Sequence, residues 1–445
     1  MTLTEPGTRA LAEPAALAGP AAAAGPSVFE ELESAVRTYC RRFPAVFTRA
    51  SGHRQWDEDG REYLDFLSGA GALNYGHNPA PARAALVDYL AADGPAHGLD
   101  LHTGAKAHFL RRFRDVVLTP RQLDYRVQFT GPTGTNAIEA AFKTARRVTG
   151  RTDIVAFTGG FHGLSLGALA ASATAFKRDA AGVPLGHVTR MPYEGYFGDD
   201  VDTIDQLTRL LDDPGSGIDL PAAFVVETVQ GEGGLAAASP AWLRRLAAVA
   251  EERGILLIVD DIQAGCGRTG TFFSFEEAGI VPDLVCLSKS ISGYGLPMAL
   301  LLIRPEFDRL GPGEHSGTFR GNNLAFVTAA ACLELWDDPG FRARVRRNAE
   351  ELDVLLAELA AEFDHLGCRV RGRGLIRGLA FTDPGLADRV SRAAFGLGLL
   401  VETSGARGQV LKIMPPIVLG AAELRQGTTL LAAAITAAER EGATS

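Results

Sequence analysis

Short, continuously apolar runs alternate with segments of helical spacing between about residues 77 and 315. Runs of this kind are typical of parallel strands that are buried on both faces and connected by helices. We therefore predict an α/β fold with a mainly parallel, doubly wound sheet. The predicted strands are Arg126–Phe129, Ile154–Phe157, Ala223–Val226, Leu256–Val259, Leu284–Leu287 and Ala299–Ile303.

The flanking patterns differ from this central region. The stretch "VFEELESAVRTYCRRFP" has Phe29, Leu32 and Val36 at helical spacing, which predicts one amphipathic helix. Two short strands are then expected around the turn at residues 57–60. After residue 322, a helix in "NLAFVTAAACLELW" and a charged helix in "FRARVRRNAEELDVLLAELAAEF" precede strands around "CRVRGRGLIRGLAF" and "QVLKIMPP".

These patterns divide the chain into an arm and three structured segments. Residues 1–27 are rich in Ala, Pro and Gly, so we expect a disordered arm. Its acidic residues and its lack of a basic region argue against a secretory signal. Residues 28–76 and 322–445 are expected to form a smaller domain, and residues 77–321 a large domain.

Composition and charge mainly exclude classes of protein. The 445 residues are 46% hydrophobic and 22% charged, as in ordinary soluble proteins, and no apolar run approaches the roughly 20 residues of a membrane helix. The net charge of -9 disfavours a nucleic-acid-binding surface. The 5 cysteines are scattered without a CxxC pair, which argues against a disulfide scaffold or zinc site and favours a cytoplasmic location.

Polar groups that can carry chemistry follow the predicted strands, at the edge where open α/β sheets bind ligands. After Phe129, the stretch "TGPTGTNAIEAAF" predicts a helix that starts just after Gly134-Thr135-Asn136. Glycine permits a tight turn, the free N–H groups of a helix start attract an anion, and the Thr135 hydroxyl is a further donor. A capped helix after an ordinary turn is the simpler alternative.

Two further strand ends carry side chains that suit a planar ligand. Phe161 and His162 lie in "TGGFHG", where an aromatic pair can stack on a heterocycle. The alternative is an ordinary packed Phe beside a solvated His. Glu227 follows the next predicted strand in "VVETVQGEGG" and suggests a substrate-facing loop, unless it is a loop charge paired with an arginine.

An acid and an amine follow the next two strands. Asp260 comes directly after an apolar run, where an ionised carboxylate needs a cationic partner such as a protonated ring nitrogen. Gln263 can donate to a ring oxygen. Lys289 follows Asp260 by one helix-and-strand crossover, so the two are expected side by side. Burial lowers the pKa of a lysine, and a neutral amine attacks aldehydes. A turn-capping Asp and a solvated Lys are the alternatives.

Together these groups describe one ligand. Proteins bind pyridoxal 5'-phosphate through an anion-binding site, an aromatic ring that stacks on the cofactor, an acid that pairs with the ring nitrogen, and a nucleophilic amine. The residues above offer all four. The anion-binding site is not a Walker motif, because no Gly-Lys-Ser/Thr follows it. A nicotinamide-dependent dehydrogenase is disfavoured, because no GxGxxG with a later acidic residue follows the first strand.

The combined motifs resemble those of the class III (omega) aminotransferases, which are pyridoxal-phosphate enzymes of fold type I. The resemblance covers nearly everything from about residue 40 onward. It implies a smaller α/β domain that is built from the N- and C-terminal segments around the large domain. The motifs are "GPTGTNAIEAA", "GFHG", "VVETVQGEGG", "VDDIQAGCGRTG", "LSKSISGYGLPMA" and "GTFRGNNLAF".

The resemblance also implies roles for single residues. Lys289 would form the covalent link to the cofactor and, with Asp260, carry the chemistry. Asp260 would pair with the pyridine nitrogen, Gln263 with the ring hydroxyl, and Thr318 with the phosphate of the neighbouring subunit. That arrangement implies a homodimer or a dimer of dimers with shared active sites. The implied cofactor contacts are Gly134, Thr135, Asn136, Phe161, His162, Asp260, Gln263, Lys289 and Thr318.

Within the family, the nearest likeness is to the diaminobutyrate–2-oxoglutarate aminotransferases of the ectoine pathway. It implies transfer of an amino group between L-glutamate and aspartate 4-semialdehyde, which are small-molecule partners. Two positions depart from the wider family pattern: Asp261 stands where many members have Glu, and Lys412 where many have Arg before Pro-Pro. A lysine cannot grip a carboxylate bidentately. The substrate contacts therefore stay open among Glu227, Arg320, Arg377, Arg407 and Lys412.

Other functions compete with this interpretation. Another omega-amine transaminase, or an aminomutase, racemase or decarboxylase of the same fold, would use the same cofactor handles. A transaminase needs an amino acceptor, so acceptor dependence separates these reactions. A noncatalytic homologue that acts as a binding protein is disfavoured by the intact Lys289, Asp260 and Gln263.

Overall fold

The computed structural model describes residues 27–444 of the chain, so the expected arm at residues 1–27 lies outside the described residues except for Ser27. The chain divides into two compact units, with the boundary between Pro44 and Ala45. No helix within residues 27–444 is both long and apolar enough to cross a membrane.

The first unit contains two short helices, α1 (Val28–Leu32) and α2 (Tyr39–Arg42), where the sequence predicted one continuous helix. That prediction is wrong for the segment between them. Glu33 adopts an extended conformation, and the Ser34 hydroxyl accepts a hydrogen bond from the Val36 N–H at 3.4 Å. Short-range bonds of this kind from a serine side chain compete with helical hydrogen bonds.

A seven-stranded sheet lies at the centre of the second unit, with the strand order β4-β10-β9-β8-β7-β5-β6. Strands β5 to β9 pair in parallel, and β10 runs antiparallel to both β9 and β4. The mainly parallel sheet and all six predicted strands are confirmed. The strands are β4 (Arg126–Phe129), β5 (Ile154–Phe157), β6 (Val188–Met191), β7 (Ala223–Val226), β8 (Leu256–Asp260), β9 (Leu284–Leu287) and β10 (Leu300–Ile303).

Strand β6 was not predicted from the sequence. This strand lies at the edge of the sheet, and only Met191 of its "VTRM" segment is fully buried. An edge strand that is half exposed needs no apolar run, so the pattern that predicted the other strands is absent here.

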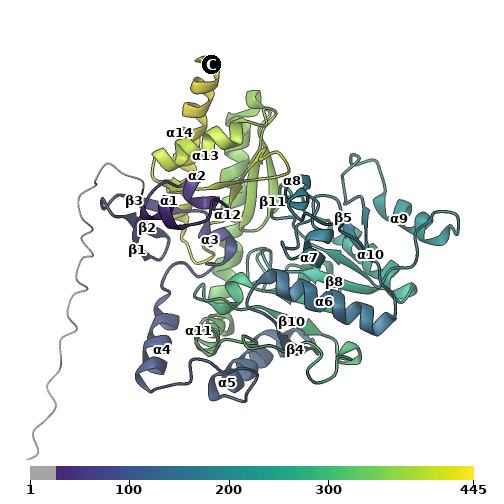
Figure 1. Ribbon diagram of the computed structural model, residues 1–445. Coiled ribbons are helices and arrows are strands. Elements are labelled where there is room, and N and C mark those ends of the chain that lie inside the picture. Colours follow the sequence, from purple (N-terminus) through teal and green to yellow (C-terminus); the bar gives the residue numbers. More distant parts are fainter. Residues whose placement is uncertain (1–26, 445) are drawn as a thin grey trace, which may run out of the picture. The chain divides into compact units, whose positions relative to one another are not determined.

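Both faces of the sheet are covered by helices, as Figure 1 shows for α6 and α10. Alternate residues of β8 belong to different hydrophobic clusters: Ile258 packs in one, and Leu257 and Val259 in the other. Ile138 of α6 lies in the first cluster and Leu246 of α10 in the second, as expected from the period-two geometry of a strand. The helices of this region are α4 (Ala80–Ala91), α5 (Gly104–Phe113), α6 (Gly134–Thr149), α7 (Leu166–Ala171), α8 (Ala175–Asp179), α9 (Thr203–Asp212), α10 (Pro240–Glu252) and α11 (Asn323–Leu333).

Two four-stranded sheets complete the second unit, in the orders β1-β2-β3-β13 and β11-β12-β15-β14. The first joins distant parts of the chain, because β13 pairs in parallel with β3. The two strands predicted around residues 57–60 are confirmed as β2 and β3, and the helices and strands predicted after residue 322 are also present. The elements are β1 (Phe47–Ser51), β2 (Arg54–Asp57), β3 (Glu62–Asp65), α3 (Ser68–Gly71), α12 (Pro339–Glu362), β11 (Arg369–Arg373), β12 (Ile376–Ala380), α13 (Leu386–Gly396), β13 (Leu399–Leu400), β14 (Glu402–Ser404), β15 (Val410–Ile413) and α14 (Ala421–Thr444).

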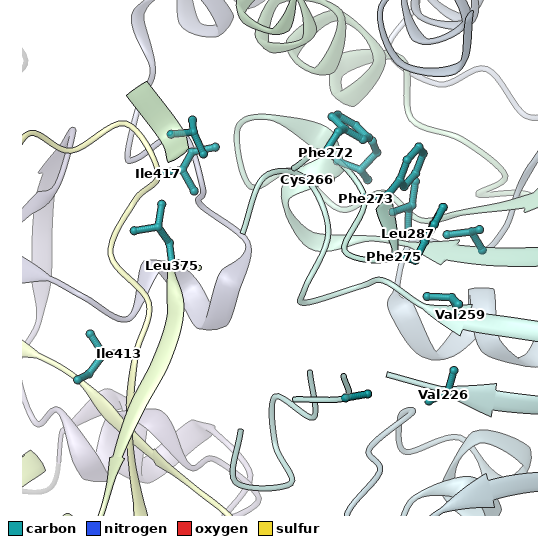
Figure 2. Packing of buried hydrophobic residues seen from close by; sticks show 14 of the residues in the cluster. Val226, Val259, Cys266, Phe272, Phe273, Phe275, Leu287, Leu375, Ile413 and Ile417 are labelled. Atoms are coloured by element: carbon teal, nitrogen blue, oxygen red, sulfur yellow. The ribbon is translucent and has the colours of Figure 1, made fainter. Parts of the chain in front are cut away.

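The segment between β8 and β9 differs from the expected crossover, because it contains turns and one 3-10 turn at Glu276–Ala278 instead of an α-helix. Gly267 and Gly270 have φ values of +95° and +97°, a conformation that interrupts a helix. Figure 2 shows Phe272, Phe273 and Phe275 of this segment beside apolar side chains of β8 and β9. The segment therefore fills the hydrophobic core with loop aromatics where a helix was expected.

Candidate functional site

A pocket of about 160 Å³ lies at the carboxyl ends of β5, β7, β8 and β9. A larger pocket of about 830 Å³ lies around the amino ends of β8 and β9, away from every side chain singled out in the sequence. Because open α/β sheets bind their ligands at the carboxyl ends of strands, we consider the smaller pocket the functional one. Its lining residues are Gly134, Thr135, Phe161, His162, Gly163, Glu227, Glu232, Asp260, Ile262, Gln263 and Lys289.

One wall of the pocket is the start of helix α6. The helix begins at Gly134, three residues earlier than the sequence predicted, and its N-cap residue Thr133 makes no side-chain capping bond. The first backbone N–H groups of a helix have no partner within the helix, so these donors remain for an anion. A Cβ atom at Gly134 would lie 2.9 Å from Ile262 Cδ1, so glycine keeps this wall open.

Glu139 and Ser165 lie behind the start of α6 and were not predicted from the sequence. The Thr135 and Ser165 hydroxyl oxygens lie 2.6 Å apart, and Ser165 Oγ donates to Glu139 Oε1 at 2.6 Å. Thr135 and Glu139 are four residues apart on α6, the spacing that puts two side chains on the same helix face, and this spacing was the available signal. Asn136 does not line the pocket, and its Oδ1 accepts a hydrogen bond from Thr133 Oγ1 at 2.8 Å.

Asp260 is the last residue of β8 and is held by two hydrogen bonds. Its Oδ2 lies 2.7 Å from His162 Nδ1, and its Oδ1 accepts from the Ile262 N–H at 3.2 Å. His162 is buried, in contrast to the solvated alternative. Burial lowers the pKa of His162, but the hydrogen bond and charge of Asp260 outweigh it and raise that pKa above its ordinary value. His162 therefore orients the Asp260 carboxylate through this contact.

Glu227 follows β7 and anchors the loop that carries Phe161. Its Oε1 accepts from the Phe161 N–H at 2.8 Å, and its Oε2 accepts from the Gly231 N–H at 3.1 Å. Within residues 27–444, no arginine forms an ion pair with Glu227, so the alternative of an arginine-paired loop charge does not hold. Burial raises the pKa of Glu227 to about 7, although the positive charge of His162 opposes this shift.

Gln263 presents an unsatisfied acceptor to the pocket. Its Nε2 donates to the Ala70 carbonyl at 3.0 Å, and its Oε1 is buried without a hydrogen-bond partner among the described residues. A buried acceptor that lacks a donor costs about 1–3 kcal/mol, so it marks a place for a ligand donor. We expected Gln263 to donate to a ring oxygen; in the structure its Nε2 already donates to Ala70, and its Oε1 is the atom that can accept from a ligand.

Lys289 stands at the end of β9, beside Asp260, because residues 260 and 286 are paired in the neighbouring strands β8 and β9. It opens a 3-10 turn (Lys289–Ser292) with φ of +52°, a left-handed conformation that is uncommon for a side chain with a Cβ. Burial lowers the pKa of Lys289, while the charge of Glu232 opposes that change. A lysine with a lowered pKa has more of its neutral, nucleophilic amine.

The two serines that flank Lys289 fix its backbone. Ser288 Oγ donates to the Met298 carbonyl at 2.9 Å, and Ser290 Oγ donates to the Gly71 carbonyl at 2.7 Å. Ser290 Oγ also accepts from the Asn74 N–H at 3.0 Å. The lysine between two apolar strands is therefore held in place from both sides.

Lys412 has two carboxylate partners of its own chain. It is completely buried, and its Nζ lies 2.6 Å from Glu232 Oε1 and 3.0 Å from Glu402 Oε1. Burial lowers the pKa of Lys412, but the two carboxylates outweigh it and raise that pKa. Burial raises the pKa of Glu232, but Lys412 lowers it more, to about 2. Glu232 and Glu402 were not predicted, because no local pattern links residues this far apart in the sequence.

The remaining predicted residues do not line this pocket. Thr318 is exposed, on the segment before α11, and Arg407 is exposed as well. Arg320 Nη2 donates to the Ser316 carbonyl at 3.3 Å. Arg377 Nη2 forms an ion pair with Asp353 at 2.6 Å. Within the described chain, none of these side chains contributes to the pocket.

The pocket residues fit a planar, phosphorylated heterocycle with an aldehyde. They offer free helix-start donors, a carboxylate for a ring nitrogen, a free acceptor for a ring hydroxyl, and an amine. Among residues 27–444, no group of three side chains is arranged to hold a metal ion. The donors themselves, which are helix-start N–H groups, a carboxylate, an amide oxygen and an amine, suit an organic cofactor that binds through hydrogen bonds and one covalent link to lysine.

Comparison with known proteins identifies the family. The class III aminotransferase family model matches residues 36–435, which is most of the chain. The chain therefore belongs to the class III aminotransferases.

Two similar proteins share about half of their residues with the chain, and a solved structure shares fewer residues but has a similar fold. A diaminobutyrate–2-oxoglutarate transaminase of Halalkalibacterium halodurans is 52% identical over 411 residues, which cover 92% of this chain and 96% of that protein. One of Nocardia farcinica is 55% identical over 410 residues, covering 92% and 94%. The ornithine aminotransferase of Toxoplasma gondii, whose crystal structure has partial occupancy of PLP in the active site, is 28% identical, with a TM-score of 0.79 and 93% and 94% coverage.

Proposed function

We propose that this chain is a pyridoxal-phosphate-dependent transaminase that moves an amino group between L-glutamate and aspartate 4-semialdehyde, giving L-2,4-diaminobutyrate and 2-oxoglutarate. The observation that carries the proposal is the placement of Lys289 and Asp260 in one pocket, at the ends of neighbouring parallel strands. The names and the high identity of the relatives support the choice of substrates.

The pocket residues have separate tasks in binding the cofactor. When bound, pyridoxal phosphate supplies a reactive aldehyde carbon and a ring that accepts electrons from the substrate. The N–H groups at the start of α6, with the Thr135 hydroxyl, would hold the phosphate. Asp260 would keep a proton on the ring nitrogen, and its bond to His162 keeps the carboxylate oriented for this task. Gln263 Oε1 would accept a hydrogen bond from the ring hydroxyl.

Lys289 would hold the cofactor between turnovers and move a proton during them. Its amine would take a proton from the substrate carbon that bears the amino group and return it on the other side of the transferred nitrogen. This task requires a neutral amine, and burial lowers the pKa of Lys289 in the required direction. The hydrogen bonds of Ser288 and Ser290 fix the backbone that carries the Lys289 amine.

Further proposals concern the oligomeric state, the cellular location and the pathway of the enzyme. We propose a homodimer with shared active sites, in which Thr318 of one subunit reaches the phosphate bound by the other. The exposure of Thr318, and of the apolar Leu99, Leu101 and Phe319, supports this arrangement. We also propose a cytoplasmic enzyme of ectoine biosynthesis. The free cysteines among the described residues support a reducing compartment, and the motifs shared with ectoine-pathway enzymes support the pathway.

Steady-state kinetics with purified enzyme and added cofactor test the reaction. We expect L-glutamate to give more than one equivalent of 2-oxoglutarate per active site only when aspartate 4-semialdehyde is present, with the parallel reciprocal plots of a two-step exchange. Product formation from a single amino acid without any acceptor would instead indicate a mutase, racemase or decarboxylase.

A further inference from the structure

The proposed reaction needs a cation that receives a substrate carboxylate, because L-glutamate, 2-oxoglutarate, diaminobutyrate and the semialdehyde all carry one. Two of the four cations that the sequence suggested are paired with carboxylates of the chain. Lys412 is neutralised by Glu232 and Glu402, and Arg377 is paired with Asp353 outside the pocket. A substrate carboxylate at Lys412 would have to displace a carboxylate that is already bound.

Lys177 is a cation beside the pocket that, unlike Lys412 and Arg377, contacts an aromatic ring. It lies on α8, and its Nζ is 4.1 Å from the centre of the Phe161 ring, which lines the pocket. Its side chain is only half-buried. Among residues 27–444, no carboxylate is within ion-pair distance of the Lys177 ammonium. The positive charge is therefore held by an aromatic face alone.

An ammonium over a phenyl ring is held weakly and can be drawn away by a carboxylate. The lysine side chain is long and flexible, so its ammonium can move without a change in the backbone. The charge of Lys177 helps to lower the pKa of Glu232, a carboxylate of the pocket. Glu232 Oε1, however, is bound by Lys412 at 2.6 Å. Glu232 is thus retained by Lys412, and the charge of Lys177 stays available to an incoming anion.

We propose that Lys177 binds the carboxylate of the amino-acid substrate at the Phe161 side of the pocket and thereby selects carboxylated amines over simple amines. This inference rests on the proposed function, because it assigns a residue to the substrate of that reaction. It gives two lysines different tasks: Lys289, which lines the pocket, acts on the amine, and Lys177, beside the pocket, binds the carboxylate.

The test compares two amines that differ only in the carboxylate. L-2,4-diaminobutyrate and 1,3-diaminopropane are mixed with cofactor-loaded enzyme, and the decay of the visible cofactor band gives an apparent second-order rate constant for each. In Lys177→Met, we expect the constant for diaminobutyrate to fall about tenfold. The constant for diaminopropane should change less than about twofold, because that amine has no carboxylate to lose. Lys177→Arg should restore the preference for diaminobutyrate.

Arg178→Met is the matched control, since it removes a positive charge from the same helix, and among the described residues no contact joins its guanidinium to the Phe161 ring. Lys177→Gln replaces Lys177→Met if the latter does not retain the cofactor band. An unchanged ratio of the two constants, or an equal fall in both, would overturn the role of Lys177. A wild-type enzyme that responds to diaminopropane but not to diaminobutyrate or L-glutamate would overturn the proposed function instead.

Discussion

Lys289 has a left-handed backbone and a buried amine, and both are unfavourable for a lysine that serves only the fold. A left-handed backbone at a residue with a Cβ costs about 1–3 kcal/mol, and burial of an ammonium adds a further cost. The hydrogen bonds of Ser288 and Ser290 over-determine this conformation. The strain is compatible with a residue whose position is set by its reaction.

Replacement of this lysine tests its role directly. We expect Lys289→Ala to abolish turnover because no other amine lines the pocket formed by the described residues. The phosphate and ring contacts do not involve the amine, so equilibrium dialysis should still detect cofactor bound without a covalent link. Lys106→Ala, which removes a lysine outside the pocket, is the control. Normal turnover in Lys289→Ala would refute the assignment.

Asp261 predicts a pH effect on stability. Burial raises the pKa of this carboxyl to about 7, although Ser274 donates to it through its N–H and its hydroxyl. The unfolded chain has a pKa of about 3.9 at an aspartate. Between these values the folded chain binds a proton that the unfolded chain releases, so the stability contribution of Asp261 falls as pH rises.

Asp261→Asn removes this titration. We therefore expect its thermal midpoint to fall less than that of the wild type between about pH 5 and about pH 8. Differential scanning calorimetry of both proteins at several pH values measures the difference. Parallel curves for the two proteins would contradict the raised pKa.

At the scale of elements, one buried arginine joins segments that are distant in sequence. Arg268 is completely buried, and its guanidinium donates to Asn74 Oδ1, to the Leu375 carbonyl at 3.1 Å and to the Pro415 carbonyl. Leu375 lies in the turn between β11 and β12, and its N–H donates to the Arg268 carbonyl at 2.7 Å; Figure 2 shows Leu375 beside the segment that carries Cys266. The arginine therefore links the segment after Asp260 to the elements that hold Lys412.

Loss of this guanidinium would leave several buried carbonyl groups without donors. We expect Arg268→Ala to lower the free energy of unfolding by about 3 kcal/mol or more, since hydrogen bonds to charged groups contribute about 1.5–3 kcal/mol each. Arg369→Ala, which removes an exposed arginine, should change it by less than about 0.5 kcal/mol. Urea unfolding followed by tryptophan fluorescence gives both values, and similar midpoints for the two variants would show that Arg268 is dispensable.

The difference between what the sequence predicted and what it missed has a physical cause. Strand ends meet at one edge of a parallel sheet, so Asp260 and Lys289 were placed together from local patterns alone. Lys412 and Glu232 meet only through tertiary packing, and no periodicity relates them. The missing helix after β8 has a similar cause, because left-handed glycines and core aromatics override the expected connection. The site roles of the pocket residues remain predictions.

At the scale of the whole molecule, the proposal of a shared active site predicts complementation between subunits. Lys289→Ala and Thr318→Val should each impair activity in the homodimer. In a mixed dimer, one site carries both changes and the other carries neither. Random mixing should therefore restore about a quarter of wild-type activity, from the symmetry of a two-fold dimer. Chromatography confirms that mixed dimers formed, and their inactivity would contradict a shared site.

The central claim is that one pocket accepts an amino group from L-glutamate and passes it to aspartate 4-semialdehyde through the cofactor held by Lys289. The most direct test is the visible spectrum of the purified, cofactor-loaded protein, recorded alone, after addition of L-glutamate, and again after the semialdehyde. We predict that L-glutamate removes the absorption band of the lysine-bound cofactor and that the semialdehyde restores it. A band that L-glutamate leaves unchanged would contradict the proposed donor, and a protein that shows no such band with added pyridoxal phosphate would contradict the role of Lys289.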